Sequence, residues 1–204
     1  MVINSIDLMY SKLPNLVLGF HGCNEKTFHN VIYEHNHLKQ SENDYDWLGH
    51  GIYFWEQGYE RALRWAITRY GEDARVVGAV LDLGLCLNLT DIRSTVALQK
   101  VYPLFYEMCR IRGEELPCNK KGRSDTDLLL RNLDCAVIEQ LHDLRKLQGE
   151  EAYDSVRGVF VEGKPAFPGS AIAKKTHIQI CIVNPNCIKG YFNPIMPVDS
   201  YRIP

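Results

Sequence analysis

Two short apolar stretches each carry a polar side chain that could do chemistry. The first, VLGFHGC (17–23), has His21 directly before Gly22. The second, LGHGIYFW (48–55), is a compact β-prone run that carries Tyr53. A histidine is a poor residue with which to fill a buried strand, so its presence raises the question of whether it binds a ligand or only completes the core.

A third stretch, THIQICIV (176–183), raises the same question near the end of the chain. Because side chains alternate along a strand, His177, Gln179 and Cys181 are expected on one face. Each stretch also has a structural interpretation. His21 fits a hydrogen-bonded core histidine, Tyr53 fits core packing with a satisfied hydroxyl, and Gln179 fits a strand residue facing water. A functional interpretation therefore depends on all three stretches together.

The composition is that of an ordinary soluble domain. The chain has 204 residues, 46% of them hydrophobic, and a formal net charge of −2. This balance does not require a nucleic-acid or membrane partner, and the basic run NKKGR (119–123) is interpreted as a solvated loop. No apolar run approaches the roughly 18 residues needed to cross a bilayer, and no secretory leader is recognisable. We therefore expect a cytoplasmic protein.

Metal binding is not expected. The seven cysteines include no CxxC pair, which argues against a thiolate zinc site. His35 and His37 are spaced too closely and have no third ligand of the usual kind nearby.

The order of the elements predicts the fold class. Strand-like runs occur at both ends of the chain, and they do not alternate regularly with helices, which favours an α+β fold over a doubly wound sheet. No dinucleotide or phosphate-loop glycine motif is present. We expect one domain, residues 1–204, with a helical insertion at about 91–149. The second inserted helix, 124–149, opens with a capping-box-like Ser124-x-x-Asp127. Residues 75–89 are expected to form a long β segment, with bends or bulges at Gly78 and Gly84.

Taken in order, the motifs resemble the ADP-ribosyltransferase fold. The resemblance is to the poly(ADP-ribose) polymerase and diphtheria-toxin-like group, with its His-Tyr-Glu triad. It is carried by His21-Gly22 at a strand end, by GHGIYF opening onto a helix, and by a late strand running into VNPxxI. It extends from about residue 15 to 192. It implies a split β-sandwich and NAD as co-substrate.

The resemblance also implies roles for individual residues. His21 would bond the adenosine-side ribose of NAD, and Gly22 would hold the nicotinamide amide through its backbone. Tyr53 would stack on the nicotinamide ring, with Trp65 as the second stacking aromatic. Arg61 lies where the family often has a small hydroxyl residue, so it could instead meet a phosphate.

The third triad residue departs from the family, because counting back from Asn184 gives Gln179 in place of glutamate. A carboxylate stabilises the positive charge that develops as the glycosidic bond breaks, whereas an amide offers no full charge. Three consequences stay open: transfer of a single ADP-ribose, a shifted alignment in which His177 faces the ribose, or a site that only binds. Glu162, Asp154 and Glu56 are other acids that could supply a charge.

The expected function is therefore an NAD-dependent mono-ADP-ribosyltransferase acting on a protein or nucleic-acid acceptor. By analogy with compact family members, a bacterial toxin or phage-defence effector with an antitoxin partner is suggested. An NAD-dependent RNA 2′-phosphotransferase is an alternative, which Arg61, Arg64 and Arg69 keep open. A non-catalytic module that binds ADP-ribose or a partner is another, and Gln179 is its best support.

Overall fold

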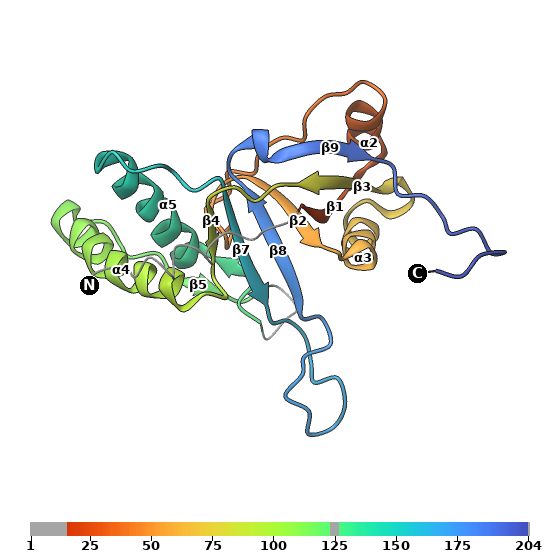
Figure 1. Cartoon of the computed structure of the whole chain (residues 1–204). Coiled ribbons are helices and arrows are strands. Elements are labelled where there is room, and N and C mark those ends of the chain that lie inside the picture. The colour runs from red at the N-terminus through yellow and green to blue at the C-terminus, as the bar shows by residue number, and fades with distance from the viewer. Residues whose placement is uncertain (1–15, 123–126, 204) are drawn as a thin grey trace.

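A seven-stranded sheet organises the protein (Figure 1). The computed structural model describes residues 16–122 and 127–203. The strand order is β4-β7-β8-β2-β1-β3-β9, and every neighbouring pair is antiparallel except β4 with β7. The strands are β1 (Val17–Asn24), β2 (Ile52–Glu56), β3 (Ala74–Leu81), β4 (Cys86–Asn88), β7 (Ser155–Phe160), β8 (His177–Ile182) and β9 (Ile188–Phe192). This mixed, mostly antiparallel architecture fits the expected α+β class.

The sheet is divided between β1 and β2. Strand β1 pairs with β3 along eight residues, but with β2 only at Gly19–Glu56 and Phe20–Trp55. One half therefore contains β1, β3 and β9, and the other contains β2, β8, β7 and β4. The two halves run across one another in Figure 1. The narrow junction leaves the far end of β1 unpaired on its β2 side.

Two helices accompany the half that contains β1, as Figure 1 shows. These are α2 (Glu25–Ile32) and α3 (Tyr59–Tyr70). Asn24 caps α2, because its side chain accepts a 2.8 Å hydrogen bond from the Thr27 amide. Gly71 ends α3 with a φ of +61°. A short 3-10 turn, Gly71–Asp73, follows α3, and another, Pro185–Cys187, lies between β8 and β9.

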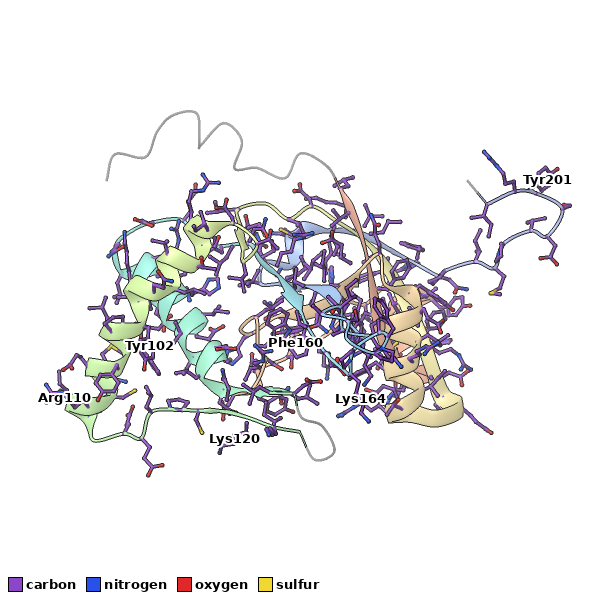
Figure 2. The ribbon with its side chains drawn as sticks, turned by 90° about the horizontal axis from the view of Figure 1, so that it is seen from below. Tyr102, Arg110, Lys120, Phe160, Lys164 and Tyr201 are labelled. Carbon is purple, nitrogen blue, oxygen red and sulfur yellow. The ribbon has the colours of Figure 1, made fainter. Side chains whose placement is uncertain are left out.

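The segment between β4 and β7 is mostly helical. It consists of α4 (Ile92–Arg112) and α5 (Asn132–Leu147), with a two-stranded sheet of β5 (Asn119–Lys120) and β6 (Leu130–Arg131) between them. Figure 2 shows Tyr102 and Arg110 of α4 on the opposite side of the molecule from Tyr201. None of the helices in the described ranges is both long and apolar enough to cross a membrane.

The predicted start of the second inserted helix is wrong. Helix α5 begins at Asn132, because residues 130–131 are extended by pairing with β5. Asn119 of β5 provides the cap, and its Oδ1 accepts from the Leu133 amide at 3.0 Å. Asp127 instead accepts from the Gly163 amide at 2.8 Å. Ser124 lies outside the described residues.

The predicted long β segment at 75–89 is two strands in different places. Strand β3 lies beside β1, whereas β4 is at the far edge of the other half. The chain turns between them at Gly84, as expected, with a φ of +55°. Gly78 is neither a bend nor a bulge, because it pairs in register with Phe20 and Phe192. It continues β3, and a Cβ there would lie 2.3 Å from the Phe192 ring.

The imidazole of His142 is buried, and both of its nitrogens lack a partner within the described ranges. His142 lies on α5 and is 4% exposed. Its ring meets Tyr153 edge to face at 5.8 Å. Burial lowers the pKa of His142 from its ordinary value of 6.5, with the nearby Glu139 opposing that shift. The neutral form is therefore favoured in the folded protein.

We expect His142→Leu to raise the free energy of unfolding by about 1 kcal/mol at pH 7, because it removes an unsatisfied buried polar group. Because the pKa of His142 is lower in the folded protein than in the unfolded chain, the free energy of unfolding of the wild type falls as pH drops below 6.5. The gain over the wild type should therefore grow between pH 7 and pH 5. Urea unfolding at both pH values measures this. His142→Gln keeps a polar group and should give no gain; equal gains from both variants would contradict the explanation.

Candidate functional site

A cavity of about 510 Å³ opens where the two halves of the sheet separate. Strands β1, β2 and β8, helix α3 and the loop after β7 all contribute to its wall. Every site residue expected from the sequence lines it: His21, Gly22, Tyr53, Arg61, Trp65 and Gln179. His177 lines it as well. Residues from segments far apart in the sequence therefore meet at one place.

His21 bridges the gap between the two halves. Its Nδ1 lies 2.8 Å from the Tyr53 carbonyl oxygen, so Nδ1 carries the proton and donates. Burial lowers the pKa of His21 from 6.5, although the bond to this carbonyl opposes the shift. The neutral ring thus keeps a lone pair on Nε2. Since His21 lines the cavity, this nitrogen is suited to accept a hydrogen bond from a ligand hydroxyl.

Gly22 presents its backbone to the same gap. The Leu18 carbonyl accepts from the Gln57 amide, so it points toward the β2 side. The backbone N–H and C=O groups of successive residues point alternately to the two edges of a strand. Those of Gly22, four residues after Leu18, therefore also point toward the β2 side. The registered pairing with β2 ends at Phe20, which leaves this edge of Gly22 open. A Cβ at Gly22 would lie 2.5 Å from the Ala62 carbonyl oxygen, so the close approach of α3 requires glycine.

Tyr53 offers its ring rather than its hydroxyl. The hydroxyl donates to the Gly49 carbonyl at 2.8 Å and accepts from the Leu48 amide at 2.9 Å. Burial raises the pKa of Tyr53 well above its ordinary value of 10. The phenol is thus a neutral structural anchor, and the ring is the part available for stacking.

Gln179 is held by a tryptophan that the sequence analysis did not identify. The Trp47 indole nitrogen lies 2.6 Å from Gln179 Oε1. Because an indole N–H can only donate, it fixes the amide with its oxygen toward Trp47. The NH₂ group has no partner among residues 16–122 and 127–203. Gln179 therefore meets a ligand as a donor. No spacing in the sequence indicated Trp47.

The register distinguishes the two candidates for the third triad position. Tyr53 lies opposite Cys181, and Gln179 is two residues further along β8, opposite Trp55. His177 is two residues beyond Gln179, at the start of the strand. Gln179 is therefore nearer the Tyr53 end of the cavity, and His177 is nearer the loop after β7.

Helix α3 contributes an aromatic wall. Trp65 packs against Trp55 with ring centroids 5.7 Å apart, and against Tyr70 at 6.0 Å. The guanidinium of Arg69 lies 5.6 Å from the Trp65 ring centroid. Arg64 instead pairs with Glu60 on the exposed side of the helix. The three arginines of α3 therefore do not converge on one point.

The charge of Arg61 is already matched inside the protein. Its guanidinium forms an ion pair with Glu162, which is 7% exposed. Lys175 also pairs with Glu162, at 3.0 Å. Glu162 is thus an acid that lies at the cavity, as the sequence allowed, but both its oxygens are bound. No set of three or more His, Cys, Asp or Glu side chains in the described ranges is grouped so as to hold a metal.

The other two candidate acids are used elsewhere. Glu56 makes a two-pronged ion pair with Arg157, which links β2 to β7. Asp154 accepts from the Leu85 amide at 2.8 Å and from the Asn184 side chain at 2.7 Å. Neither acid lines the cavity.

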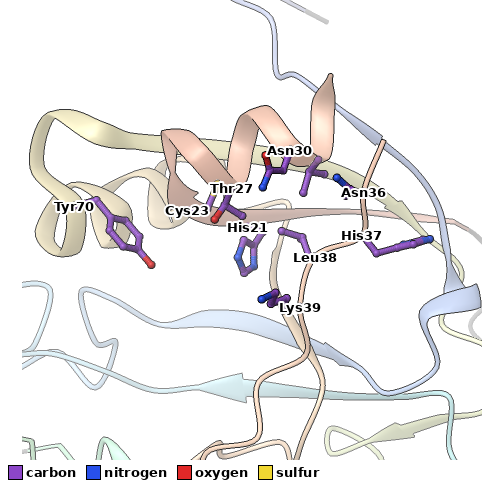
Figure 3. A pocket seen from close by; sticks show the side chains of 10 residues that line it. His21, Cys23, Thr27, Asn30, Asn36, His37, Leu38, Lys39 and Tyr70 are labelled. Carbon is purple, nitrogen blue, oxygen red and sulfur yellow. The ribbon is translucent and has the colours of Figure 1, made fainter. Parts of the chain in front are cut away.

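A second cavity of about 520 Å³ adjoins the first. His21, Lys39 and Tyr70 line both of them. Figure 3 shows the imidazole of His21 beside Lys39, with Thr27 and Asn30 projecting from α2. The two cavities together provide room for a ligand with two bulky ends, and His21 stands where they meet.

Removing the charge of Glu162 should weaken the fold. Glu162→Gln leaves the mostly buried Arg61 without its anion, so we expect the free energy of unfolding to fall by about 2 kcal/mol. The matched control is Glu60→Gln, which breaks the exposed pair with Arg64 and should cost less than about 0.5 kcal/mol. Urea denaturation of both variants tests this. Equal losses would mean that the Arg61–Glu162 pair is no stronger than a surface pair.

Comparison with known proteins finds no match to a family model, to a curated protein or to a solved structure. The function of this chain is therefore inferred from the residues around its cavities.

Proposed function

We propose that this protein is an NAD-dependent mono-ADP-ribosyltransferase. It would cleave the N-glycosidic bond between nicotinamide and ribose, and transfer one ADP-ribose to a macromolecular acceptor, protein or nucleic acid. The observation that carries the proposal is the meeting of His21, Tyr53 and Gln179, from three different strands, in one cavity. The sequence resemblance assigns these three positions to NAD.

The local chemistry fits the two halves of NAD. The open backbone edge of Gly22 suits a carboxamide, because the carboxamide oxygen needs a donor and its NH₂ group needs an acceptor. The ring of Tyr53 and the indole of Trp65 suit a flat nicotinamide ring. Nε2 of His21 suits a ribose hydroxyl. The neighbouring cavity, beyond His21, suits the adenosine end.

The neutral third position favours a single transfer. Gln179 can donate its NH₂ to a ribose hydroxyl oxygen, but it brings no negative charge to the forming oxocarbenium ion. Glu162 does not replace that charge, because Arg61 and Lys175 neutralise it. A slow enzyme that adds one ADP-ribose fits this arrangement better than one that extends chains.

The RNA 2′-phosphotransferase alternative has less support. That reaction needs several basic side chains around one phosphate. Here Arg64 faces solvent and Arg61 is bound to Glu162. Binding without catalysis is the other alternative, and the first experiment below distinguishes it.

His21→Asn tests the proposed NAD site. Asparagine can keep a donor for the Tyr53 carbonyl but lacks Nε2, so we expect NAD affinity to fall about tenfold or more, as for loss of one good hydrogen bond. Calorimetry measures affinity. Released nicotinamide, with and without cell lysate, measures cleavage, and labelled NAD traced into protein, RNA and DNA fractions identifies the acceptor class.

The control for that experiment is His29→Asn, an exposed histidine of α2 that lines neither cavity. It should bind NAD like the wild type. Unchanged affinity in His21→Asn would refute the site, and NAD binding without nicotinamide release under any condition would leave a binding module.

Gln179→Glu should accelerate nicotinamide release about tenfold or more. A unit charge near 4 Å in a partly dry site is worth up to about 4 kcal/mol, of which only part is realised. One carboxylate oxygen can still accept from Trp47, and the other takes the place of NH₂. Gln179→Leu, which offers neither charge nor hydrogen bond, is the matched comparison. If Gln179→Glu is no faster than the wild type, Gln179 does not face the reacting ribose.

A further inference from the structure

We propose that His177 is the general base that takes the proton from the ADP-ribose acceptor, through its Nε2. This rests on the proposed function and adds a residue to it. The base would act on any acceptor that must lose a proton as it attacks, whether water, an alcohol or an amine.

The imidazole of His177 is held firmly at the cavity wall. Its ring stacks on Phe160 of β7, with centroids 5.4 Å apart and planes tilted by 21°. Trp55 of β2 contacts it from another direction, at 6.3 Å. Phe160 and His177 are also opposite one another in the register of β7 and β8. A ring fixed on two sides is suited to present one nitrogen in one direction.

The hydrogen bonds identify which nitrogen is basic. Nδ1 lies 2.6 Å from the Lys175 carbonyl oxygen, so it carries the proton and donates. The Arg61 Nε–H is 3.5 Å from the same nitrogen, but a protonated Nδ1 cannot accept from it. Nε2 therefore holds the free lone pair, and no group in the described ranges donates to it.

The two carboxylates that line the cavity, Glu162 and Asp46, already accept hydrogen bonds. Both oxygens of Glu162 are bound by Arg61 and Lys175. Asp46 Oδ2 accepts from the Asn43 backbone amide at 2.9 Å, and its Oδ1 receives the Asn43 side chain at 3.4 Å. His21 lies at the junction of the two cavities, where the ribose is proposed to sit. His177, near the loop after β7, is left for the acceptor.

Burial favours the neutral form of His177, and the charged groups around it act in both directions. Arg61 on α3 and Lys175 and Glu162 on the loop are its charged neighbours, and Arg131 lies 4.8 Å from the centroid of the adjoining Phe160 ring. Burial lowers the pKa of His177 from 6.5, and Arg61 acts in the same direction, whereas the Lys175 carbonyl and Glu162 oppose it. The proton-accepting form therefore predominates at neutral pH.

The proposed step balances without any further reactant. The acceptor atom bonds to C1 of the nicotinamide-side ribose as the C1–N bond breaks. The bonding pair passes to the pyridinium nitrogen, which leaves as neutral nicotinamide. The acceptor's proton moves to Nε2 of His177, and the resulting imidazolium passes it to water.

The test compares His177→Asn with the wild type for two kinds of nucleophile. Asparagine can still donate to the Lys175 carbonyl but has no equivalent of Nε2. With NAD in water, or with added methanol, we expect nicotinamide release to fall about 100-fold, within the usual range for a lost general base. Azide carries no proton to remove. In azide, ADP-ribosyl azide should form at a rate close to that of the wild type.

The pH profile gives a second measurement. Wild-type transfer to water should decline as pH falls through the pKa of His177, below 6.5, and His177→Asn should lack that decline. His29→Asn is the control and should behave like the wild type. Full water attack in His177→Asn, or equal loss with water and azide, overturns the role of His177. Absence of nicotinamide release by the wild type with every nucleophile overturns the proposed function and this role together.

Discussion

The site depends on one constraint, the early end of pairing between β1 and β2. Two registered pairs join these strands, and beyond Phe20 they separate. The Tyr53 carbonyl has no backbone partner on β1, because the pairing has ended there. It accepts a hydrogen bond from His21 Nδ1 instead. That bond holds the gap at a defined width and leaves the Gly22 edge open. The cavity is thus a product of incomplete sheet pairing, which leaves the backbone edge of Gly22 available instead of paired within a continuous sheet.

The three residues proposed to meet NAD carry no net charge. His21 is neutral, the Tyr53 hydroxyl is bound to backbone, and Gln179 is an amide, while the nearby Glu162 is paired with two cations. These residues therefore act through hydrogen bonds and a flat aromatic surface, whereas the cations Lys39 and Arg69 line other parts of the cavity. Such a site can orient a ligand well, but it stabilises developing positive charge weakly. This is the physical basis for a proposed single transfer.

Two corrections to the expected fold have the same cause. Helix α5 starts eight residues later than its sequence signal, because Asn119 of β5 caps it from a distant segment. The segment 75–89 crosses between the two halves of the sheet instead of forming one strand, because its parts pair with different neighbours. Local patterns identified these elements, and pairing between distant segments determined where they begin and lie.

The sequence by itself indicated the α+β class from the order of its strand-like and helical runs, and the resemblance carried by its short motifs singled out residues that line the cavity. Only the tertiary structure decided how those residues are presented. Trp47 orients Gln179, and the Lys175 carbonyl selects the tautomer of His177. Arg61 forms an ion pair with Glu162. In each of these contacts, the fold either brings two residues together or sets the orientation of a side chain. The direction of a hydrogen bond depends on this three-dimensional placement, which residue spacing does not encode.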